Sequence, residues 1–129
     1  MPFVIAVDFD GTLFEHQYPG IGAPLSNVID KVKQFKSAGA EIVLWTCRES
    51  KALQEAVETC KKFGIEFDAV NENSPSQKEF QKVAFSKYGM DLALHKIYAD
   101  FYVDDKAYGS IENFLKLNVE QIMNVEQIM

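Results

Sequence analysis

The chain has 129 residues, of which 47% are hydrophobic and 25% charged, a composition typical of one globular domain. A formal net charge of −6 argues against long nucleic acids and anionic membrane surfaces as partners. No apolar run approaches the roughly 20 residues that span a bilayer. Residues 3–7 are too short an apolar stretch for a signal peptide and run directly into Asp8. We therefore predict a cytoplasmic protein without a membrane segment.

Short apolar runs alternate along the chain with segments whose apolar residues recur at helical spacing. Residues 14–24 hold two prolines and two glycines and are predicted to form a loop. In chain order, we expect a strand at 2–7, a helix between Ser26 and Gly39, a strand at 41–46, a helix at 53–64, a strand at 65–70, a helix at 76–88, a strand at 97–103 and a helix at 110–123.

This alternation predicts an α/β protein with a three-layer Rossmann-like fold around a central parallel sheet. Ligands of such sheets bind beyond the carboxyl ends of the strands. Polar residues follow each predicted strand in this sequence: Asp8 and Asp10, then Thr46, then Asn71 and Asn73, then Asp104 and Asp105. The sequence therefore predicts one polar site at that edge.

Four of these residues are carboxylates, two after the first strand and two after the last. Like charges brought together resist ionisation, and a hard cation relieves the repulsion. Ligands that offer only oxygen favour Mg²⁺. A magnesium site beside a free carboxylate is suited to phosphoryl transfer, because the carboxylate can attack phosphorus. The alternative is that each acid only caps a turn or a helix.

Three motifs carry a resemblance to a known family. Residues 7–13 (VDFDGTL) match the DxDGT first motif of the haloacid dehalogenase superfamily. Residues 44–46 are similar to its second motif, an apolar strand that ends in Thr or Ser, and residues 102–105 (YVDD) to its double-aspartate fourth motif. The resemblance covers residues 3–108 and implies a small hydrolase of that superfamily.

The resemblance implies a role for each matching residue. Asp8 would be the nucleophile and a Mg²⁺ ligand, and Asp10 the general acid and base, with its backbone carbonyl also on the metal. Thr46 would hydrogen-bond a phosphoryl oxygen. Asp104 and Asp105 would hold Mg²⁺, with Asp105 as the direct ligand. The second aspartate, Asp10, favours a phosphatase or phosphotransferase over a dehalogenase.

The third motif of the superfamily is a lysine that steadies the nucleophile and the phosphate. Its spacing varies, and the candidates here are Lys78, Lys82, Lys87 and Lys96. We favour Lys96, which directly precedes the last predicted strand, although its side chain would have to reach the opposite end of that strand.

Three further residues are candidates for contact with the substrate. Arg48 follows Thr46 by two positions, and the alternative for it is a surface residue at a helix start. Asn73 follows the third predicted strand, where turn formation alone also explains an asparagine. His16 lies in the first loop, and the alternative for it is an exposed loop residue.

Residues 1–117 are predicted to form the single catalytic domain. Residues 118–129 are the hexapeptide NVEQIM written twice. A shift of six residues rotates a helix face by about 240°, so one apolar face cannot serve both copies. We expect the second copy to fray or to dock on a partner.

The loop at 14–24 leaves no room for a substrate-selecting cap domain. An open site suits a phosphorylated small molecule or macromolecule, or a partner chain that acts as a lid. This leaves open whether the chain forms a homo-oligomer. We predict a magnesium-dependent phosphomonoester hydrolase or phosphotransferase that works through an aspartyl-phosphate. The alternatives are a signalling phospho-acceptor module and a non-catalytic binding protein with an acidic magnesium site.

Overall fold

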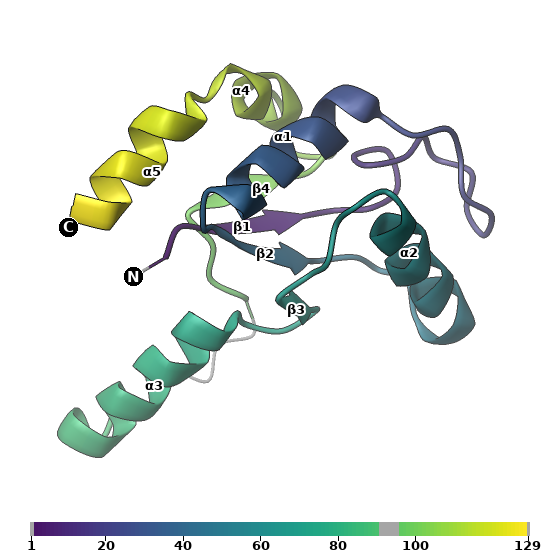
Figure 1. The fold of residues 1–129 in the computed structure, drawn as a ribbon. Coiled ribbons are helices and arrows are strands. Elements are labelled where there is room, and N and C mark those ends of the chain that lie inside the picture. Colours follow the sequence, from purple (N-terminus) through teal and green to yellow (C-terminus); the bar gives the residue numbers. More distant parts are fainter. Residues whose placement is uncertain (1, 91–95, 129) are drawn as a thin grey trace.

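The computed structural model describes residues 2–90 and 96–128, and the side chains of these as far as residue 124. Four parallel strands form one sheet in the order β3-β2-β1-β4 (Figure 1). The strands are β1 (Val4–Val7), β2 (Glu41–Leu44), β3 (Ala69–Val70) and β4 (Phe101–Val103). The helices described are α1 (Ser26–Ser37), α2 (Ser50–Lys62), α3 (Pro75–Tyr88), α4 (Ser110–Lys116) and α5 (Val119–Ile128). The predicted α/β class with a central parallel sheet and no large cap is confirmed.

One face of the sheet carries most of the core. Ile5 and Val7 of β1 point to this face together with Ile42 and Leu44 of β2, and all four are fully buried. Helices α1, α2, α4 and α5 supply the apolar side chains that cover them, because each presents apolar residues at helical spacing. The residues on these helices that reach the core are Val28, Ile29, Val32, Phe35, Ala56, Cys60, Phe114 and Met123.

The opposite face is covered differently. Its strand residues are small or β-branched, as Val4, Ala6 and Val43 show, and the extended segment 97–99 lies over them through Ile97 and Ala99. The Tyr102 hydroxyl fixes this segment, since it donates to the Ile97 carbonyl at 2.6 Å and accepts from the Ala99 N–H at 3.1 Å. Helix α3 also begins on this side, where the Ser76 backbone N–H donates to Glu41 at 3.2 Å.

All four strands are shorter than predicted, and the third and the fourth begin four residues late for the same physical reason. The third begins at residue 69 rather than 65, because the Asp68 carboxylate accepts the Ile42 N–H at 2.7 Å, where a strand carbonyl would otherwise accept it. The fourth begins at residue 101 rather than 97, because the Asp100 carboxylate accepts the Val4 N–H at 2.8 Å. Both aspartates start their strands at the edge of the sheet away from the predicted site.

The predicted last helix at 110–123 is wrong, because the structure divides it into α4 and α5. Leu117 adopts an extended conformation between them, and its carbonyl accepts a hydrogen bond from Lys31. Asn118 then begins the next helix, with its side-chain oxygen accepting the Gln121 N–H at 2.9 Å. An asparagine in front of an apolar run is a helix-start signal that the helical periodicity concealed.

The first copy of the duplicated hexapeptide packs against the main core. Met123 is buried, and Val119 and Ile122 are partly buried against the same cluster as β1 and α1. The backbone of α5 continues through the second copy as far as Ile128. The duplication therefore extends a helix whose first turns belong to the fold.

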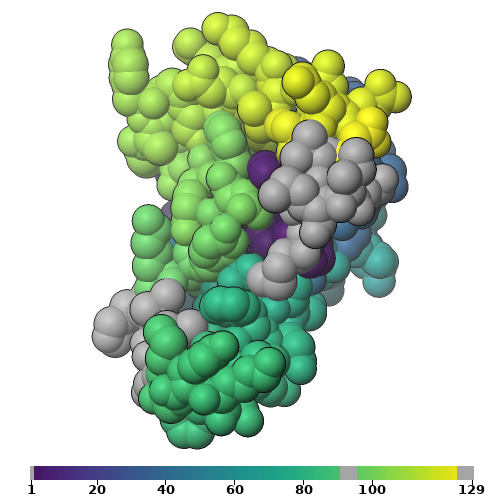
Figure 2. Space-filling view, turned by 90° about the vertical axis from the view of Figure 1, so that its left-hand side faces the viewer, coloured from purple at the N-terminus to yellow at the C-terminus, as the bar shows by residue number. Residues whose placement is uncertain are grey.

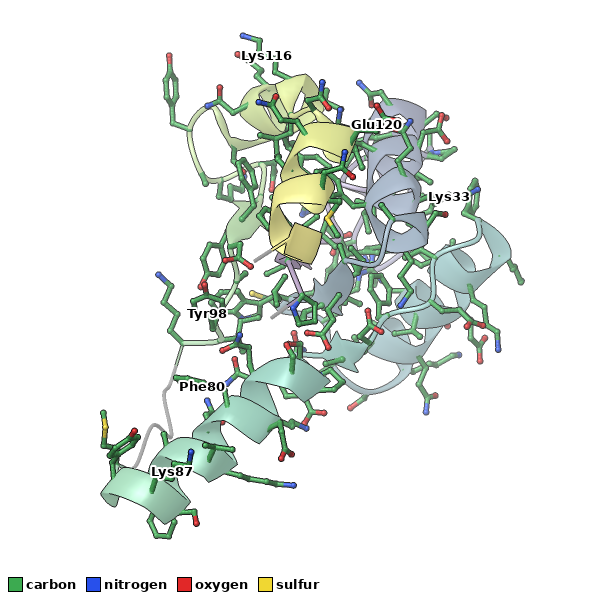
Figure 3. The ribbon with its side chains drawn as sticks, turned by 60° about the vertical axis from the view of Figure 1, so that its left-hand side comes forward. Lys33, Phe80, Lys87, Tyr98, Lys116 and Glu120 are labelled. Carbon is green, nitrogen blue, oxygen red and sulfur yellow. The ribbon has the colours of Figure 1, made fainter. Side chains whose placement is uncertain are left out.

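Helix α3 projects from the body of the protein, at the end opposite to α4 and α5 (Figures 2 and 3). Only Gln77 and Ala84 of its residues are buried, while Phe80 and Tyr88 are largely exposed.

Among the residues that the structure describes, no helix is both long enough and apolar enough to cross a membrane.

Candidate active site

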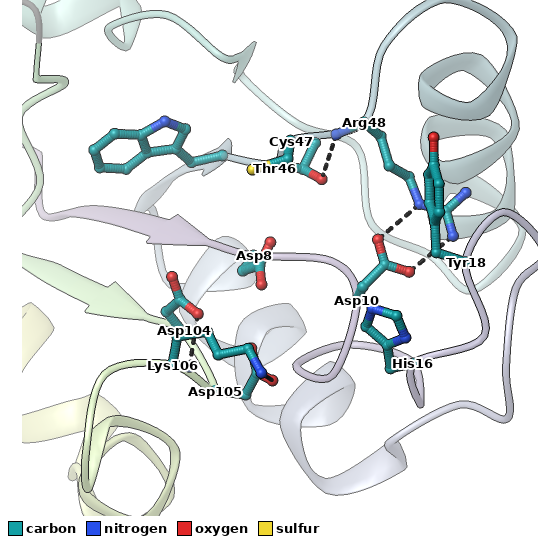
Figure 4. A pocket seen from close by; sticks show the side chains of 11 residues that line it. Asp8, Asp10, His16, Tyr18, Thr46, Cys47, Arg48, Asp104, Asp105 and Lys106 are labelled. Atoms are coloured by element: carbon teal, nitrogen blue, oxygen red, sulfur yellow. Dashed lines mark hydrogen bonds and ion pairs between the residues drawn. The ribbon is translucent and has the colours of Figure 1, made fainter.

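The carboxyl ends of three neighbouring strands meet at one edge of the sheet. Val7, the last residue of β1, pairs with Leu44 at the end of β2 and with Val103 at the end of β4. The residues that follow these three strands therefore lie next to one another at this edge of the sheet, as predicted. They surround a pocket of about 730 Å³ (Figure 4). The residues that line it are Asp8, Asp10, His16, Tyr18, Trp45, Thr46, Cys47, Arg48, Asp104, Asp105 and Lys106.

Three carboxylates converge in this pocket. Asp8, Asp104 and Asp105 each place one oxygen so that the three atoms lie within 4.8 Å of one another. The backbone fixes two of these residues. The Asp8 N–H donates to the Val103 carbonyl at 3.0 Å, and the Asp104 carboxylate accepts the Lys106 N–H at 2.9 Å. The sequence predicted that the two acidic pairs come together, and three of the four carboxylates do so.

Gly11 and Thr12 explain how Asp105 comes so close to the first loop. Gly11 has φ +80°, and a Cβ at this position would lie 2.3 Å from an Asp105 carboxylate oxygen. Glycine is therefore required both by the left-handed backbone and by the lack of space. The buried Thr12 hydroxyl accepts the Asp105 N–H at 3.0 Å and so ties the loop after β1 to the loop after β4.

The pKa of Asp8 responds to its burial and to the negative charges around it. Burial raises its pKa from 3.8 to about 7. A backbone hydrogen bond from Phe9 opposes this rise, and the negative charges of Asp104, Asp105 and Asp10 add to it. Without a cation, about half of the Asp8 carboxyl groups in the folded protein therefore carry a proton at pH 7.

These carboxylates fit a hard divalent cation. Three anionic oxygens from two strand ends are the type of donor that Mg²⁺ takes, with waters completing its shell. A bound cation would also oppose the rise in the pKa of Asp8, which burial causes first and the repulsion from the neighbouring carboxylates adds to. The carboxyl group of Asp10 is not part of this cluster, and the part predicted for its backbone carbonyl stays a prediction.

Asp10 instead forms an ion pair with Arg48. Its two oxygens accept hydrogen bonds from Nε and Nη2 of the guanidinium, each at 2.8 Å. The arginine side chain is 1% exposed and that of Asp10 is 15% exposed, so the pair is largely shielded from water. Such two-point pairing fixes both the position and the rotation of the carboxylate.

The remaining donors of Arg48 hold the first loop. Nη1 donates to the Pro19 carbonyl at 3.2 Å and to the Ala52 carbonyl at 3.3 Å, and Nη2 donates to the Gly20 carbonyl at 2.6 Å. A guanidinium has five N–H donors, and all five are used in these contacts and the ion pair. The prediction that Arg48 binds the substrate is therefore corrected, because it has no donor left for one.

Thr46 lies at the mouth of the pocket, as predicted. Its backbone N–H donates to the side-chain oxygen of Asn71 at 2.8 Å. Its hydroxyl oxygen accepts a hydrogen bond from the backbone N–H of Arg48 at 3.2 Å, which leaves the hydroxyl proton available for a hydrogen bond to a ligand. Asn71, with φ 54°, thus positions Thr46 from the loop after β3.

Asn73 and Lys96 are predicted site residues that the structure does not bring into the pocket. The Asn73 side chain accepts the Tyr98 N–H at 2.8 Å and so anchors the segment that leads to β4. Lys96 precedes β4 at its amino end, and its Nζ lies 4.9 Å from the centre of the Tyr102 ring. The other lysine candidates, Lys78, Lys82 and Lys87, lie on α3.

The lysine that does line the pocket is Lys106, which the sequence reasoning overlooked. Its Nζ is 3.9 Å from an Asp105 carboxylate oxygen. Tyr18 and Trp45 were also missed as wall residues, whereas His16 was a candidate and does line the pocket. Their positions in the sequence could have indicated two of these wall residues, because Lys106 directly follows the double aspartate and Trp45 directly precedes Thr46.

Comparison with known proteins gives a relative of the whole chain. A conserved protein of Bacteroides thetaiotaomicron of known structure is 30% identical, with a TM-score of 0.67, over 99% of this chain and 92% of its own. The chain therefore belongs to the same family as that protein. A Vibrio cholerae structure is 21% identical over 96% of this chain and 98% of its own, with a TM-score of 0.46. No protein-family model and no curated protein matches the chain.

Replacing Arg48 by Met tests its structural role. We expect R48M to lower the free energy of unfolding by about 3 kcal/mol, because Asp10 would keep its charge in a shielded place without a partner. Urea denaturation measures this change. The control is K51M, at a side chain that is 89% exposed, which should change stability by less than about 0.5 kcal/mol. An R48M protein as stable as the wild type would show that the ion pair does not hold the loop.

The titration of Asp8 makes a prediction about pH. Its pKa is higher in the folded than in the unfolded state, so the folded protein binds the extra proton between about pH 4 and pH 7. Wild-type stability in EDTA therefore falls as pH rises through this range. The stability advantage of D8N over the wild type should grow by about 2 kcal/mol from pH 4 to pH 8, roughly half the unscreened value because Asp8 is partly exposed. Saturating Mg²⁺ should remove the difference. An advantage that stays constant with pH would contradict this assignment.

Proposed function

We propose that the protein is a magnesium-dependent phosphomonoesterase of the haloacid dehalogenase type, with Asp8 as its nucleophile. The observation that carries this proposal is the convergence of Asp8 with Asp104 and Asp105 within 4.8 Å, in a pocket that Asp10 and Thr46 also line. The three sequence motifs that resemble that superfamily meet at this one place.

The cation would bind to the carboxylates of Asp8, Asp104 and Asp105. When bound there, Mg²⁺ would offset negative charge on the phosphoryl oxygens. It would also keep Asp8 ionised at neutral pH, because the positive charge opposes the rise in its pKa. An ionised Asp8 is needed, since the protonated carboxyl is a poor nucleophile.

The chemistry of the first step belongs to Asp8 and Asp10. An oxygen of the Asp8 carboxylate attacks phosphorus, and the bond between phosphorus and the ester oxygen breaks. The leaving oxygen takes the proton carried by the Asp10 carboxyl. Each oxygen of Asp10 has a second lone pair besides the one that accepts from Arg48, so the carboxyl can hold this proton while it stays clamped.

In the second step, Asp10 accepts a proton from a water molecule that attacks the phosphorus of the aspartyl-phosphate. The bond between phosphorus and Asp8 breaks, and free phosphate and the original carboxylate are restored. The Thr46 hydroxyl donates a hydrogen bond to a phosphoryl oxygen in both steps and keeps its proton. Of the described side chains that line the pocket, Lys106 is the cation that retains donors for the phosphate, and it takes the place that the sequence assigned to Lys96.

Hydrolysis of p-nitrophenyl phosphate tests the proposal. We expect turnover that requires Mg²⁺ and is lost in EDTA, and a loss of at least about 10³-fold in D8N because the nucleophile is removed. The matched control is D30N, which changes an exposed carboxylate on α1 and should retain wild-type activity. Release of p-nitrophenol is followed by absorbance.

Two outcomes would contradict the proposal. No magnesium-dependent turnover over a broad panel of phosphate esters would indicate a binding protein rather than an enzyme. A phosphorylated protein that is stable for hours and transfers its phosphate only to another protein would indicate a signalling module.

A further inference from the structure

The first loop, residues 14–24, forms one side of the pocket. Asp10, His16 and Tyr18 gather on that side of Asp8, whereas Lys106 lies on the other (Figure 4). In the proposed reaction Asp10 protonates the leaving oxygen, so the leaving group must lie next to Asp10. The part of the substrate that is released therefore faces His16 and Tyr18.

Tyr18 is the outermost layer of a stack. The Arg48 guanidinium lies over the Phe9 ring, 4.8 Å from its centre, and over the Tyr18 ring, 5.1 Å from its centre. Arg48 is buried, whereas Tyr18 is 55% exposed. Arg48 thus lies against the Tyr18 ring, and the ring remains more than half exposed where it lines the pocket. A flat ring in the substrate can extend this stack.

The stack is held rigidly. Arg48 donates to the carbonyls of Pro19 and Gly20, the two residues that follow Tyr18, and the same guanidinium pairs with Asp10. The position of the tyrosine ring is therefore coupled to the position of the general acid. A surface that needs no ordering on binding contributes more to affinity than a mobile one.

The charges on this side of the pocket disfavour an anionic leaving group. Arg48 has used all its donors, and Lys106 lies beside Asp105 on the other side of Asp8. A second negative group on the substrate would face Asp10 with no free Lys or Arg among the described residues that line this side. His16 offers a ring nitrogen for a hydrogen bond to a neutral polar group. The pocket volume of about 730 Å³ lies in the range of small-molecule sites.

We infer that Tyr18 is a specificity-determining residue, and that the substrate is a small phosphate monoester whose leaving group carries a flat, uncharged, unsaturated ring. This inference rests on the proposed hydrolase function. It narrows that function from phosphate esters in general to those whose released alcohol stacks on Tyr18.

A matched pair of esters tests the inference. Benzyl phosphate and cyclohexylmethyl phosphate have the same linkage and release similar primary alcohols, but only the first has a flat ring. We expect the wild-type kcat/KM to be about tenfold higher for the benzyl ester, which corresponds to about 1.4 kcal/mol. 4-Carboxybenzyl phosphate should be about tenfold poorer than benzyl phosphate, because its carboxylate meets no free cation.

Two variants assign the preference to the tyrosine ring. Y18F keeps the ring and should keep the preference, whereas Y18L removes the flat surface and should bring the ratio of the two kcat/KM values close to one. The ratio is taken within one protein sample, so a smaller folded fraction in Y18L cancels. Equal rates for the two esters in the wild type, or an unchanged ratio in Y18L, would overturn the inference and leave the hydrolase function standing. If the wild type hydrolyses p-nitrophenyl phosphate with Mg²⁺ but neither of the two esters, the inference is overturned and the hydrolase function stands. If it hydrolyses no ester of the panel, the proposed function fails and the inference fails with it.

Discussion

Repulsion between carboxylates at one edge of the sheet is the constraint around which this protein is built. Asp8, Asp104 and Asp105 lie within 4.8 Å of one another, and burial together with the neighbouring charges raises the pKa of Asp8 to about 7. An arrangement that costs stability in this way is common where a site is built for a task. Several features exist to hold it: the parallel register of β1 and β4, the glycine that lets Asp105 approach, and the Thr12 hydroxyl that ties the two loops.

Arg48 balances the charge of the fourth carboxylate in the pocket, that of Asp10. It separates Asp10 from the crowded cluster by pairing with both of its oxygens, and the same guanidinium fastens the first loop. Asp10, the loop and the Tyr18 ring are thereby linked through one guanidinium. In the function that we propose, this linked group is the part of the pocket that would distinguish one substrate from another.

The sequence predicted the α/β class, the alternation of elements and the edge at which the site lies, because apolar runs and helical spacing are local signals. It also predicted that four carboxylates would meet, since strand ends of a parallel sheet are adjacent. Asp8, Asp104 and Asp105 do meet, whereas the carboxylate of Asp10 pairs with Arg48 instead. The sequence did not predict the strand starts at Asp68 and Asp100 or the break at Leu117, where a side chain replaces a backbone partner or caps a helix. The role of Arg48 was mistaken for a related reason. Three of its partners, Asp10, Pro19 and Gly20, lie far away in sequence, and only the folded chain shows that they take four of its five donors while Ala52 takes the fifth.

The central claim is that the three carboxylates hold a divalent cation beside the nucleophile. Crystals of the protein grown with Mn²⁺ in place of Mg²⁺ test this claim most directly, because the anomalous scattering of manganese locates the ion without reference to activity. The account predicts one strong anomalous peak at about 2 Å from carboxylate oxygens of Asp8 and Asp105. A pocket without a peak at millimolar Mn²⁺, or an ion that does not contact Asp8, would contradict it.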